Sequence, residues 1–394
     1  MIGLDEAHAR LLGRLQPVGE EEVDHEHALM RRLSRSVAAA RTQPPVDVSA
    51  MDGYAVQSAS LGEAPVDLLL AGESAAGHAY PEKIKPGECI RVSTGAAIPA
   101  GADQVVIQEN TARKGQQVTM QDQANPGRHI RRAGLDFARG DTLLPAGAPL
   151  TAEALALAVS AGVSRFQVWK RPLVGILSTG DELVEPGQSP APDQIYNSIS
   201  HALAGMVQAW GGQPHYVGIA RDNPDDVAAK LDHAQTCDLL VTVGGASVGD
   251  HDHLRRVFAE RGGQLVFEKI AVKPGKPTWF GMMEPGFVLG LPGNPVSALV
   301  MARLLLRPAL AKLSGADHVR VYRTAALAQA LAGNGDRETF VRARLDTGRM
   351  TIAPDTNQDS SALSALVRSN ALIRRKIGAP AAQAGERVEF IDLD

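Results

Sequence analysis

The hydrophobic and polar positions between residues 172 and 313 follow two alternating periods. Short apolar runs, typical of buried strands, are followed by longer stretches with apolar residues at helical spacing. The predicted strands cover 174–177, 215–219, 238–243, 265–270 and 287–291, and the predicted helices cover 198–210, 224–234, 253–261 and 295–313. This alternation predicts βαβ units in a doubly wound, mostly parallel α/β sheet.

Two of these helices are expected to begin in the same way. Asn223–Pro224 and Asn294–Pro295 each place an Asn before a Pro at the first helical position. An Asn side chain there can accept a hydrogen bond from the first turn, and the fixed backbone angle of Pro suits that turn. We therefore predict a side-chain N-cap at both positions.

The pattern differs on either side of this region. Within residues 5–41 and over 151–162, apolar residues recur at helical spacing, with Thr151 as a candidate N-cap. The positions concerned in the first segment are Ala7, Leu11, Leu12 and Leu15, then Ala28, Leu29, Leu33 and Val37. Residues 44–138 and 317–394 instead contain short β-prone runs separated by Gly and Pro.

These patterns predict a multidomain protein of α/β plus β class. A split helical domain covers 1–45 and 139–171, and a small β-domain, 46–138, is inserted into it. The α/β domain covers 172–315, and a C-terminal β-domain covers 316–394. The length of 394 residues agrees, because it exceeds what one hydrophobic core usually holds.

Composition narrows the classes of partner. The 40 Lys and Arg nearly balance the 44 Asp and Glu, for a net charge of −4, so we expect no nucleic-acid partner. No apolar stretch predicts a membrane span, and charges within residues 1–15 argue against a signal peptide. The two cysteines, Cys89 and Cys237, form no disulfide framework and lack metal-ligand spacing. We expect a cytoplasmic protein without membrane attachment.

Three Gly-rich loops follow predicted strands, at 178–182, 244–252 and 292–297. Because ligands of open α/β sheets bind beyond the carboxyl ends of the strands, these loops are the first candidate site. The second loop matches neither a Walker A sequence nor GxGxxG, yet its bare backbone N–H groups could approach a phosphate. A tight strand-to-helix turn capped by Asp250 or Asp252 is an equally good interpretation. The third loop opens a helix whose N-terminus favours anions, and Ser297 could extend that site.

Charged residues cluster near these loops. Lys273 and Lys276 lie in a segment that Pro274 and Pro277 restrict, so both ammonium groups could bind one small dianion, although an isolated pair is more often solvated. Carboxylates also gather in the loops, and Mg²⁺ prefers carboxylate and phosphate oxygens together. The members are Asp181, Glu182, Asp222, Asp250 and Asp252. Each carboxylate taken separately is more often a helix cap.

Taken in order along the chain, six motifs resemble the MoeA family, the molybdopterin molybdenumtransferases, to which the gephyrin E-domain also belongs. The motifs are Ser49–Val56, Ser93–Pro99, Ser178–Leu183, Gly244–Asp250, Lys273–Pro277 and Gly290–Pro295. The resemblance extends from about residue 5 to 345. The resemblance makes Asp52 a candidate functional residue, although its Asp-Gly pair alone would indicate an ordinary turn.

The resemblance implies the last step of molybdenum-cofactor assembly, in which adenylylated molybdopterin and molybdate give molybdenum-molybdopterin and AMP. The expected cofactor is Mg²⁺, with Zn²⁺ left open. The resemblance also implies a molybdopterin-binding α/β domain, an elongated split domain, a C-terminal domain like a β-barrel and a homodimer with its cleft between subunits. Molybdopterin adenylyltransferase and other cofactor-assembly proteins are candidate partners.

We expect each candidate residue to have one of four roles. Those assigned to catalysis are Asp52, Asp136, Glu182, Asp222 and Asp252. Those assigned to the pterin and nucleotide are Thr94, Ser178, Thr179, Gly180, Gly244, Gly245, Ser247, Gly249, Pro292, Gly293, Asn294 and Pro295. Those assigned to molybdate are Lys273, Lys276, Ser297 and Arg337 or Arg342. Those assigned to the metal are Asp181, Glu182, Asp250 and Asp252.

The chain departs from the family near its C-terminus, where Asp359 follows Gln358 at a position that commonly holds Gly. A carboxylate there would weaken anion binding if it faced the site. Two other functions stay open: a molybdopterin adenylyltransferase, whose single domain resembles only 172–313, and a non-catalytic pterin-binding scaffold. The retained charges at Asp181, Glu182, Lys273 and Lys276 argue against a scaffold.

Overall fold

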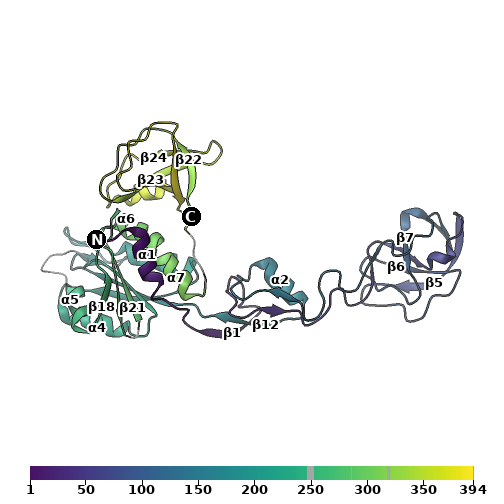
Figure 1. Cartoon of the computed structure of the whole chain (residues 1–394). Coiled ribbons are helices and arrows are strands. Elements are labelled where there is room, and N and C mark those ends of the chain that lie inside the picture. The colour runs from purple at the N-terminus through teal and green to yellow at the C-terminus, as the bar shows by residue number, and fades with distance from the viewer. Residues whose placement is uncertain (246–252, 285, 317–319, 394) are drawn as a thin grey trace. The chain divides into compact units, whose positions relative to one another are not determined.

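The structure is a computed structural model that describes residues 1–245, 253–284, 286–316 and 320–393 (Figure 1). The chain divides into two compact units. The first unit comprises Met1–Glu21 and Val168–Asp394, and the second comprises Glu22–Gln167. The strands β1 (Glu20–Asp24) and β12 (Arg165–Trp169) pair where the chain passes from one unit to the other.

A six-stranded sheet forms the centre of the first unit, in the order β16-β13-β17-β21-β20-β18. Four strands are parallel: β13 (Leu173–Thr179), β16 (Gln213–Ala220), β17 (Leu239–Val243) and β21 (Gly286–Leu291). The other two, β18 (Gln264–Phe267) and β20 (Trp279–Met283), add antiparallel pairs at one side. The mostly parallel sheet is therefore confirmed, and β20 is a strand that the sequence pattern did not predict.

Helices cover both faces of this sheet. One face packs against α1 (Leu4–Leu12), α3 (Ser198–Ala209), α6 (Pro295–Met301) and α7 (Arg307–Leu313), the last two joined by a π-helical turn at Ala302–Leu306. The other face packs against α4 (Pro224–His233) and α5 (His253–Glu260). Side chains of β17 alternate between the two cores, since Val241 faces the first and Leu240 the second. The doubly wound prediction is confirmed.

A closed five-stranded barrel follows in the same unit. It consists of β22 (Arg323–Leu327), β23 (Glu338–Asp346), β24 (Thr351–Pro354), β25 (Ala371–Arg375) and β26 (Arg387–Asp392), with the short helix α8 (Leu363–Arg368). The barrel closes because β23 pairs with both β24 and β25. A short strand of the sheet region, β19 (Val272–Lys273), pairs with β23 and links the two parts.

The second unit contains a six-stranded β-sheet of order β7-β4-β6-β5-β9-β8. Its strands are β4 (Gly53–Val56), β5 (Val66–Ser74), β6 (Glu88–Val92), β7 (Gln104–Ile107), β8 (Thr111–Lys114) and β9 (Gln117–Met120). Short pairs join β3 (Val48–Ser49) to β10 (Ile130–Arg131) and β2 (Val37–Ala38) to β11 (Thr142–Leu144). Helix α2 (Ala152–Ser160) begins as predicted, with the Thr151 hydroxyl accepting from the Ala154 N–H at 3.2 Å.

The helix expected around residues 28–37 is wrong. Ala28 and Leu33 are fully buried, but their segment is irregular, and its backbone bonds to a distant part of the chain. The N–H of Met30 donates to Leu150 and that of Leu33 to Ala148, at 2.8 and 3.0 Å. Pairing with 147–150 thus supplies the hydrogen bonds that a helix would have made.

The described helices include none that is both long and apolar enough to cross a membrane. Cys89 and Cys237 are both free and buried.

Candidate functional site

The predicted Gly-rich loops meet at the carboxyl edge of the parallel strands. The N–H of Gly180 donates to the carbonyl of Ala220 at 3.2 Å, and that of Gly244 to the carbonyl of Leu291 at 3.3 Å. A Cβ placed on Gly293 would lie 3.6 Å from the Cα of Gly244. The loops that follow β13, β17 and β21 are therefore in contact, as their positions after parallel strands implied.

Thr179 ends β13 with a buried hydroxyl that has no hydrogen-bond partner. Gly244 packs directly on it, at a φ of +90°. A Cβ at Gly244 would lie 2.6 Å from the Thr179 carbonyl oxygen and 2.8 Å from its Oγ1. Only glycine fits there, and an unsatisfied polar atom in such a place is typical of a ligand or water site.

Ser178 has a structural role that the sequence did not indicate. Its side chain is fully buried, and its hydroxyl lies 3.0 Å from Asn197 Oδ1 and 2.6 Å from the Ser200 hydroxyl. Both partners lie at the start of α3. Ser178 therefore anchors this helix to β13, and its hydroxyl is already occupied.

Three predicted carboxylates lie at the sheet edge. Asp181 Oδ1 accepts from the N–H of Asp222 at 3.2 Å. The Glu182 carboxylate lies over Gly180, within 2.7 Å of where a Cβ would stand. The described ranges contain no group of three or more His, Cys, Asp or Glu arranged to hold a metal. Ser247, Gly249, Asp250 and Asp252 lie outside the described residues.

The predicted molybdate ligands line one pocket of 570 Å³. The sheet region contributes Lys273, Lys276 and Ser297, and the barrel contributes Arg337. Among the other lining residues are Asn294, Asn334, Thr339, Gln358, Asp359, Ser360 and Arg375. Four residues assigned to one anion from three separate segments thus come together.

Local structure fixes the two lysines at the pocket. Lys273 lies in β19, which pairs with β23 of the barrel. The carbonyl of Lys276 accepts from the N–H of Ile270 at 3.1 Å. Between them, Gly275 has a φ of +126°, and a Cβ there would collide with the Met301 thioether on α6. The lysine loop is therefore held by both parts of this unit.

Asn334 organises the barrel side of the pocket, and the sequence analysis missed it. Its amide nitrogen donates to the carbonyls of Arg337 and Arg375, at 2.7 and 2.8 Å. Its Oδ1 accepts from the Thr339 hydroxyl at 2.8 Å. The only signal in the sequence is an Asn334–Gly335 pair, which indicates no more than a turn.

Arg342 does not line the pocket, contrary to one of the two alternatives for a molybdate ligand. Its guanidinium is buried and donates to the carbonyls of Asn357 and Asp359, each at 2.9 Å. The side chain of Gln358 bonds to the Arg342 backbone in both directions at 3.0 Å. Arg342 therefore supports the loop that forms one pocket wall.

Asp359 lies on that wall as an anionic side chain. Its Oδ1 accepts from the N–H and the hydroxyl of Ser361, at 2.8 and 2.6 Å. These two bonds hold the pKa of Asp359 below its ordinary value. The carboxylate is thus ionised near neutral pH, with one oxygen occupied by Ser361.

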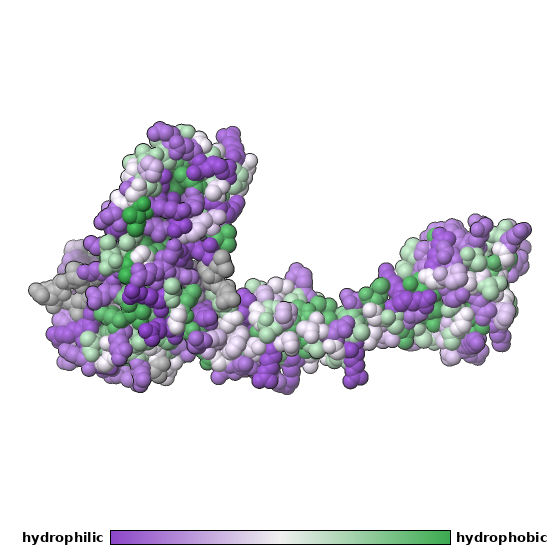
Figure 2. All heavy atoms as spheres, in the orientation of Figure 1, coloured by the Kyte–Doolittle hydropathy of each residue, from purple (hydrophilic) through white to green (hydrophobic). Residues whose placement is uncertain are grey.

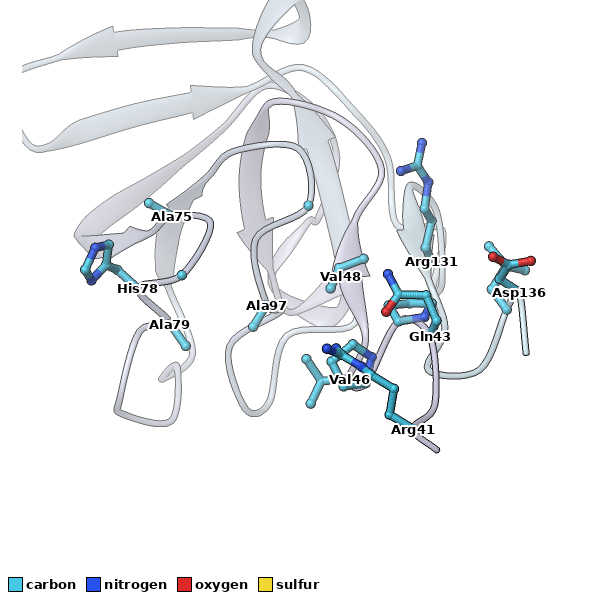
Figure 3. A pocket seen from close by; sticks show the side chains of 15 residues that line it. Arg41, Gln43, Val46, Val48, Ala75, His78, Ala79, Ala97, Arg131 and Asp136 are labelled. Carbon is cyan, nitrogen blue, oxygen red and sulfur yellow. The ribbon is translucent and has the colours of Figure 1, made fainter. Parts of the chain in front are cut away.

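The second unit brings together two other predicted residues. Asp52 precedes β4, and its Oδ1 accepts from the N–H of Thr94 at 2.7 Å. Asp136 lines a separate pocket of 710 Å³ in this unit (Figure 3). Gly95, next to Thr94, lines the same pocket.

Family models match most of the chain. They are the MoeA N-terminal region (domain I and II) over residues 2–162, a probable molybdopterin binding domain over 175–312, and the MoeA C-terminal region (domain IV) over 324–393. A molybdopterin molybdenumtransferase of Haemophilus influenzae is 35% identical over 98% of both chains. Molybdopterin molybdenumtransferase 2 of Mycobacterium tuberculosis is 36% identical over 92% of both.

Solved structures agree with these matches. Two crystal structures of a molybdopterin biosynthesis MoeA protein from Pyrococcus horikoshii superpose with TM-scores of 0.87 and 0.83. They are 29% and 28% identical in sequence and cover 100% and 99% of this chain and 99% of their own. The similarity therefore extends over both compact units.

Proposed function

Because this chain belongs to the molybdopterin molybdenumtransferase (MoeA) family, a family of transferases that insert molybdenum during molybdenum-cofactor biosynthesis, we propose that its substrates are molybdate and adenylylated molybdopterin. Water hydrolyses the phosphoanhydride of the pterin nucleotide, so AMP leaves and the pterin keeps its own phosphate. The two dithiolene thiols bind the molybdenum, and their protons leave with one molybdate oxygen as water. A molybdopterin adenylyltransferase would supply this substrate.

The observation that carries the proposal is the pocket shared by Lys273, Lys276, Ser297 and Arg337. Molybdate is a tetrahedral dianion, so it needs several fixed cationic and hydrogen-bonding donors. Two ammonium groups, a guanidinium and a hydroxyl supply them in a pocket built partly from the sheet region and partly from the barrel. The negative charge of Asp359 on the pocket wall is unfavourable for binding an anion, because it opposes the positive charge of the lysines and Arg337.

The pterin nucleotide is assigned to the sheet edge. The bare backbone of Gly244 over Thr179 supports a phosphate there, since no side chain at Gly244 keeps a phosphate from the backbone N–H groups. Gly180 directly follows Thr179 in the chain, and Gly245 directly follows Gly244. The loop 292–295 lies beside Gly244, whose N–H donates to the Leu291 carbonyl just before that loop. Asn294 lines the adjoining molybdate pocket.

The carboxylates at this edge suit a hard cation. Asp181 and Glu182 offer oxygen donors without a neighbouring Cys or His in their loop, which favours Mg²⁺ over Zn²⁺. When bound, Mg²⁺ would neutralise negative charge on the substrate phosphates. Asp222, at the same edge, is proposed to orient the reacting groups, and the catalytic roles of Asp52 and Asp136 in the second unit stay predictions.

A homodimer is the proposed assembly. Only Ala158 of α2 is buried, while Val159 is 45% exposed and Ala152 and Ala156 are also exposed. Apolar colours appear on the surface over the α2 segment, near the middle of Figure 2. A helix with so apolar an exposed surface needs a cover, and a second copy of this chain supplies one. The free, buried cysteines support a cytoplasmic location.

AMP release tests the reaction. The purified chain, supplied with adenylylated molybdopterin, molybdate and Mg²⁺, should release one AMP for each molybdenum-molybdopterin formed. AMP release without molybdenum transfer, or none at all with Mg²⁺ present, would overturn the proposal. A chain that instead made adenylylated molybdopterin from ATP would be an adenylyltransferase.

A further inference from the structure

Asp359 is the one carboxylate that lines the molybdate pocket, within the part of the chain that the structure describes. The other charged side chains of this lining are Lys273, Lys276, Arg337 and Arg375. All four are cations, and they attract an oxyanion whether or not it carries a proton. Asp359 differs, because an ionised carboxylate accepts hydrogen bonds and donates none. It is therefore the charged group of this lining that can distinguish oxyanions of equal charge.

Hydrogen bonds fix the backbone and one carboxylate oxygen of Asp359. Its N–H donates to Asn357 Oδ1, and its carbonyl accepts from the guanidinium of Arg342, each at 2.9 Å. Its Oδ1 accepts both bonds from Ser361, whereas Oδ2 has no hydrogen-bond partner among the described residues. The side chain thus keeps one acceptor oxygen for a ligand, and less conformational entropy is lost when that ligand binds.

The cations of the pocket do not neutralise this carboxylate. Over the described ranges, Asp359 makes no ion pair with either lysine or with Arg337. Arg337 instead lies 3.9 Å from the carboxylate of Asp336, which is outside the lining. Opposite charges therefore line one pocket without contacting each other. A ligand that lies between them has to offer acceptors to the cations and a hydrogen-bond donor to Asp359.

Tetrahedral dianions fall into two classes in this respect. Hydrogen phosphate, HPO₄²⁻, carries a proton on one oxygen, whereas molybdate and sulfate carry none near neutral pH. The P–OH group donates a hydrogen bond to a carboxylate, and the other three oxygens accept from lysine and arginine. A dianion without a proton leaves the carboxylate unpaired and is repelled by it. The same side chain thus favours the first class and disfavours the second.

We propose that Asp359 makes this pocket a site for proton-bearing oxyanions, so that inorganic phosphate competes with molybdate for it. Asp359 accepts from the phosphate hydroxyl, and Lys273, Lys276 and Arg337 bind the remaining oxygens. This inference rests on the proposed function, because it concerns the pocket assigned there to molybdate. Asp359 is then a specificity-determining residue, and molybdenum insertion by this chain becomes sensitive to the phosphate concentration.

Titration calorimetry of the full chain, without pterin nucleotide and at about pH 8, tests this preference, since phosphate and sulfate are then both dianions and Asp359 is ionised. Phosphate should bind at least about tenfold more tightly than sulfate, as expected for one hydrogen bond to a charged group. Added phosphate should raise the apparent Kd for molybdate, and the same concentration of sulfate should raise it much less. Arsenate, which is protonated like phosphate, and selenate, which is not, repeat the comparison with larger anions.

Three variants locate the preference. Asp359→Asn should abolish it, so that phosphate and sulfate bind within about twofold of each other, because an amide can donate to either anion. Asp336→Asn is the matched control: it removes a carboxylate near Arg337 that does not line the pocket, and it should leave the ratio of the two affinities unchanged. Lys276→Ala should weaken phosphate and sulfate alike, because its ammonium group attracts both.

Equal binding of phosphate and sulfate by the wild type, or no binding of phosphate, would overturn the proposal. So would an unchanged ratio in Asp359→Asn with normal thermal unfolding. Its failure is distinguishable from that of the proposed function. A chain that prefers phosphate but releases no AMP retains this inference and loses the proposed reaction, whereas a chain that transfers molybdenum without distinguishing the two anions loses this inference alone.

Discussion

The side-chain amide of Asn294 donates a 3.0 Å hydrogen bond to the hydroxyl of Ser360. This bond joins the start of α6 to a barrel loop at the molybdate pocket, reinforced by the N–H of Val296 donating to the Ser360 carbonyl at 3.0 Å. Asn294 makes no side-chain cap bond, whereas Asn223 caps α4 by accepting from the N–H of Asp226 at 2.8 Å. Two Asn-Pro pairs with the same sequence pattern therefore have different roles.

Replacing each Asn with Ala separates these roles. Asn294→Ala should weaken molybdate binding roughly twofold to tenfold with little change in unfolding free energy, because it removes a bond that closes the pocket. Asn223→Ala should lower the unfolding free energy by about 1 kcal/mol and leave molybdate binding unchanged. Titration calorimetry and denaturant unfolding measure the two effects, and equal destabilisation by both variants would show that Asn294 is a cap after all.

Lys276→Ala should weaken molybdate binding about tenfold or more, because it removes one of the cationic donors in the pocket. Binding of the pterin nucleotide should stay within about twofold of the wild type, since its proposed site lies at the sheet edge. The measurement is calorimetry with each ligand alone. A parallel loss of both affinities would refute the division of the site.

Asp359→Asn should tighten molybdate binding roughly threefold to tenfold, because it removes a negative charge from the pocket wall. The gain should shrink at high salt. Since Ser361 lowers the pKa of Asp359, the carboxylate stays ionised from neutral pH down to the acidic range, and the gain should be constant between about pH 6 and 8. Any stability that this ionised group contributes is lost only as pH falls through the lowered pKa. Weaker binding by the variant would show that Asp359 assists the anion.

Val159→Glu should shift the chain from dimer to monomer, because it places a charge on the exposed apolar surface of α2. Sedimentation velocity measures the mass. Glu153→Gln, on the same helix, changes charge without adding a buried one and serves as the control. A wild-type chain that is monomeric at micromolar concentration would contradict the homodimer directly.

Much of the fold was predictable because βα units leave two distinct periods in a sequence. The four parallel strands and their helices follow that pattern, whereas β20 is a continuous apolar run, Trp279–Met283, whose period indicates neither state. The helix expected around residues 28–37 is the opposite case, because there the pattern predicted an element that the structure does not contain. Its buried positions have helical spacing, but the chain there pairs with residues 147–150, which no local pattern reveals.

The candidate site was predictable only in part, for a related reason. Lys273, Lys276 and Ser297 belong to local motifs, so their sequence neighbours identify them. Asn334 acts through the carbonyl of Arg375, 41 residues away, and Arg342 acts through carbonyls 15 and 17 residues away. Such supporting roles depend on which distant backbone atoms the fold brings near. No local sequence motif therefore identifies these residues.

The pairing of β1 with β12 brings the two ends of the second unit together. The N–H of Lys170 donates to the carbonyl of Gly19 at 2.8 Å, so the chain leaves the first unit and returns to it at adjacent points. Domains with adjacent ends can be inserted into a host without breaking its fold. The entire second unit, with its own pocket, is therefore one continuous insertion at a single point of the sheet-and-barrel unit.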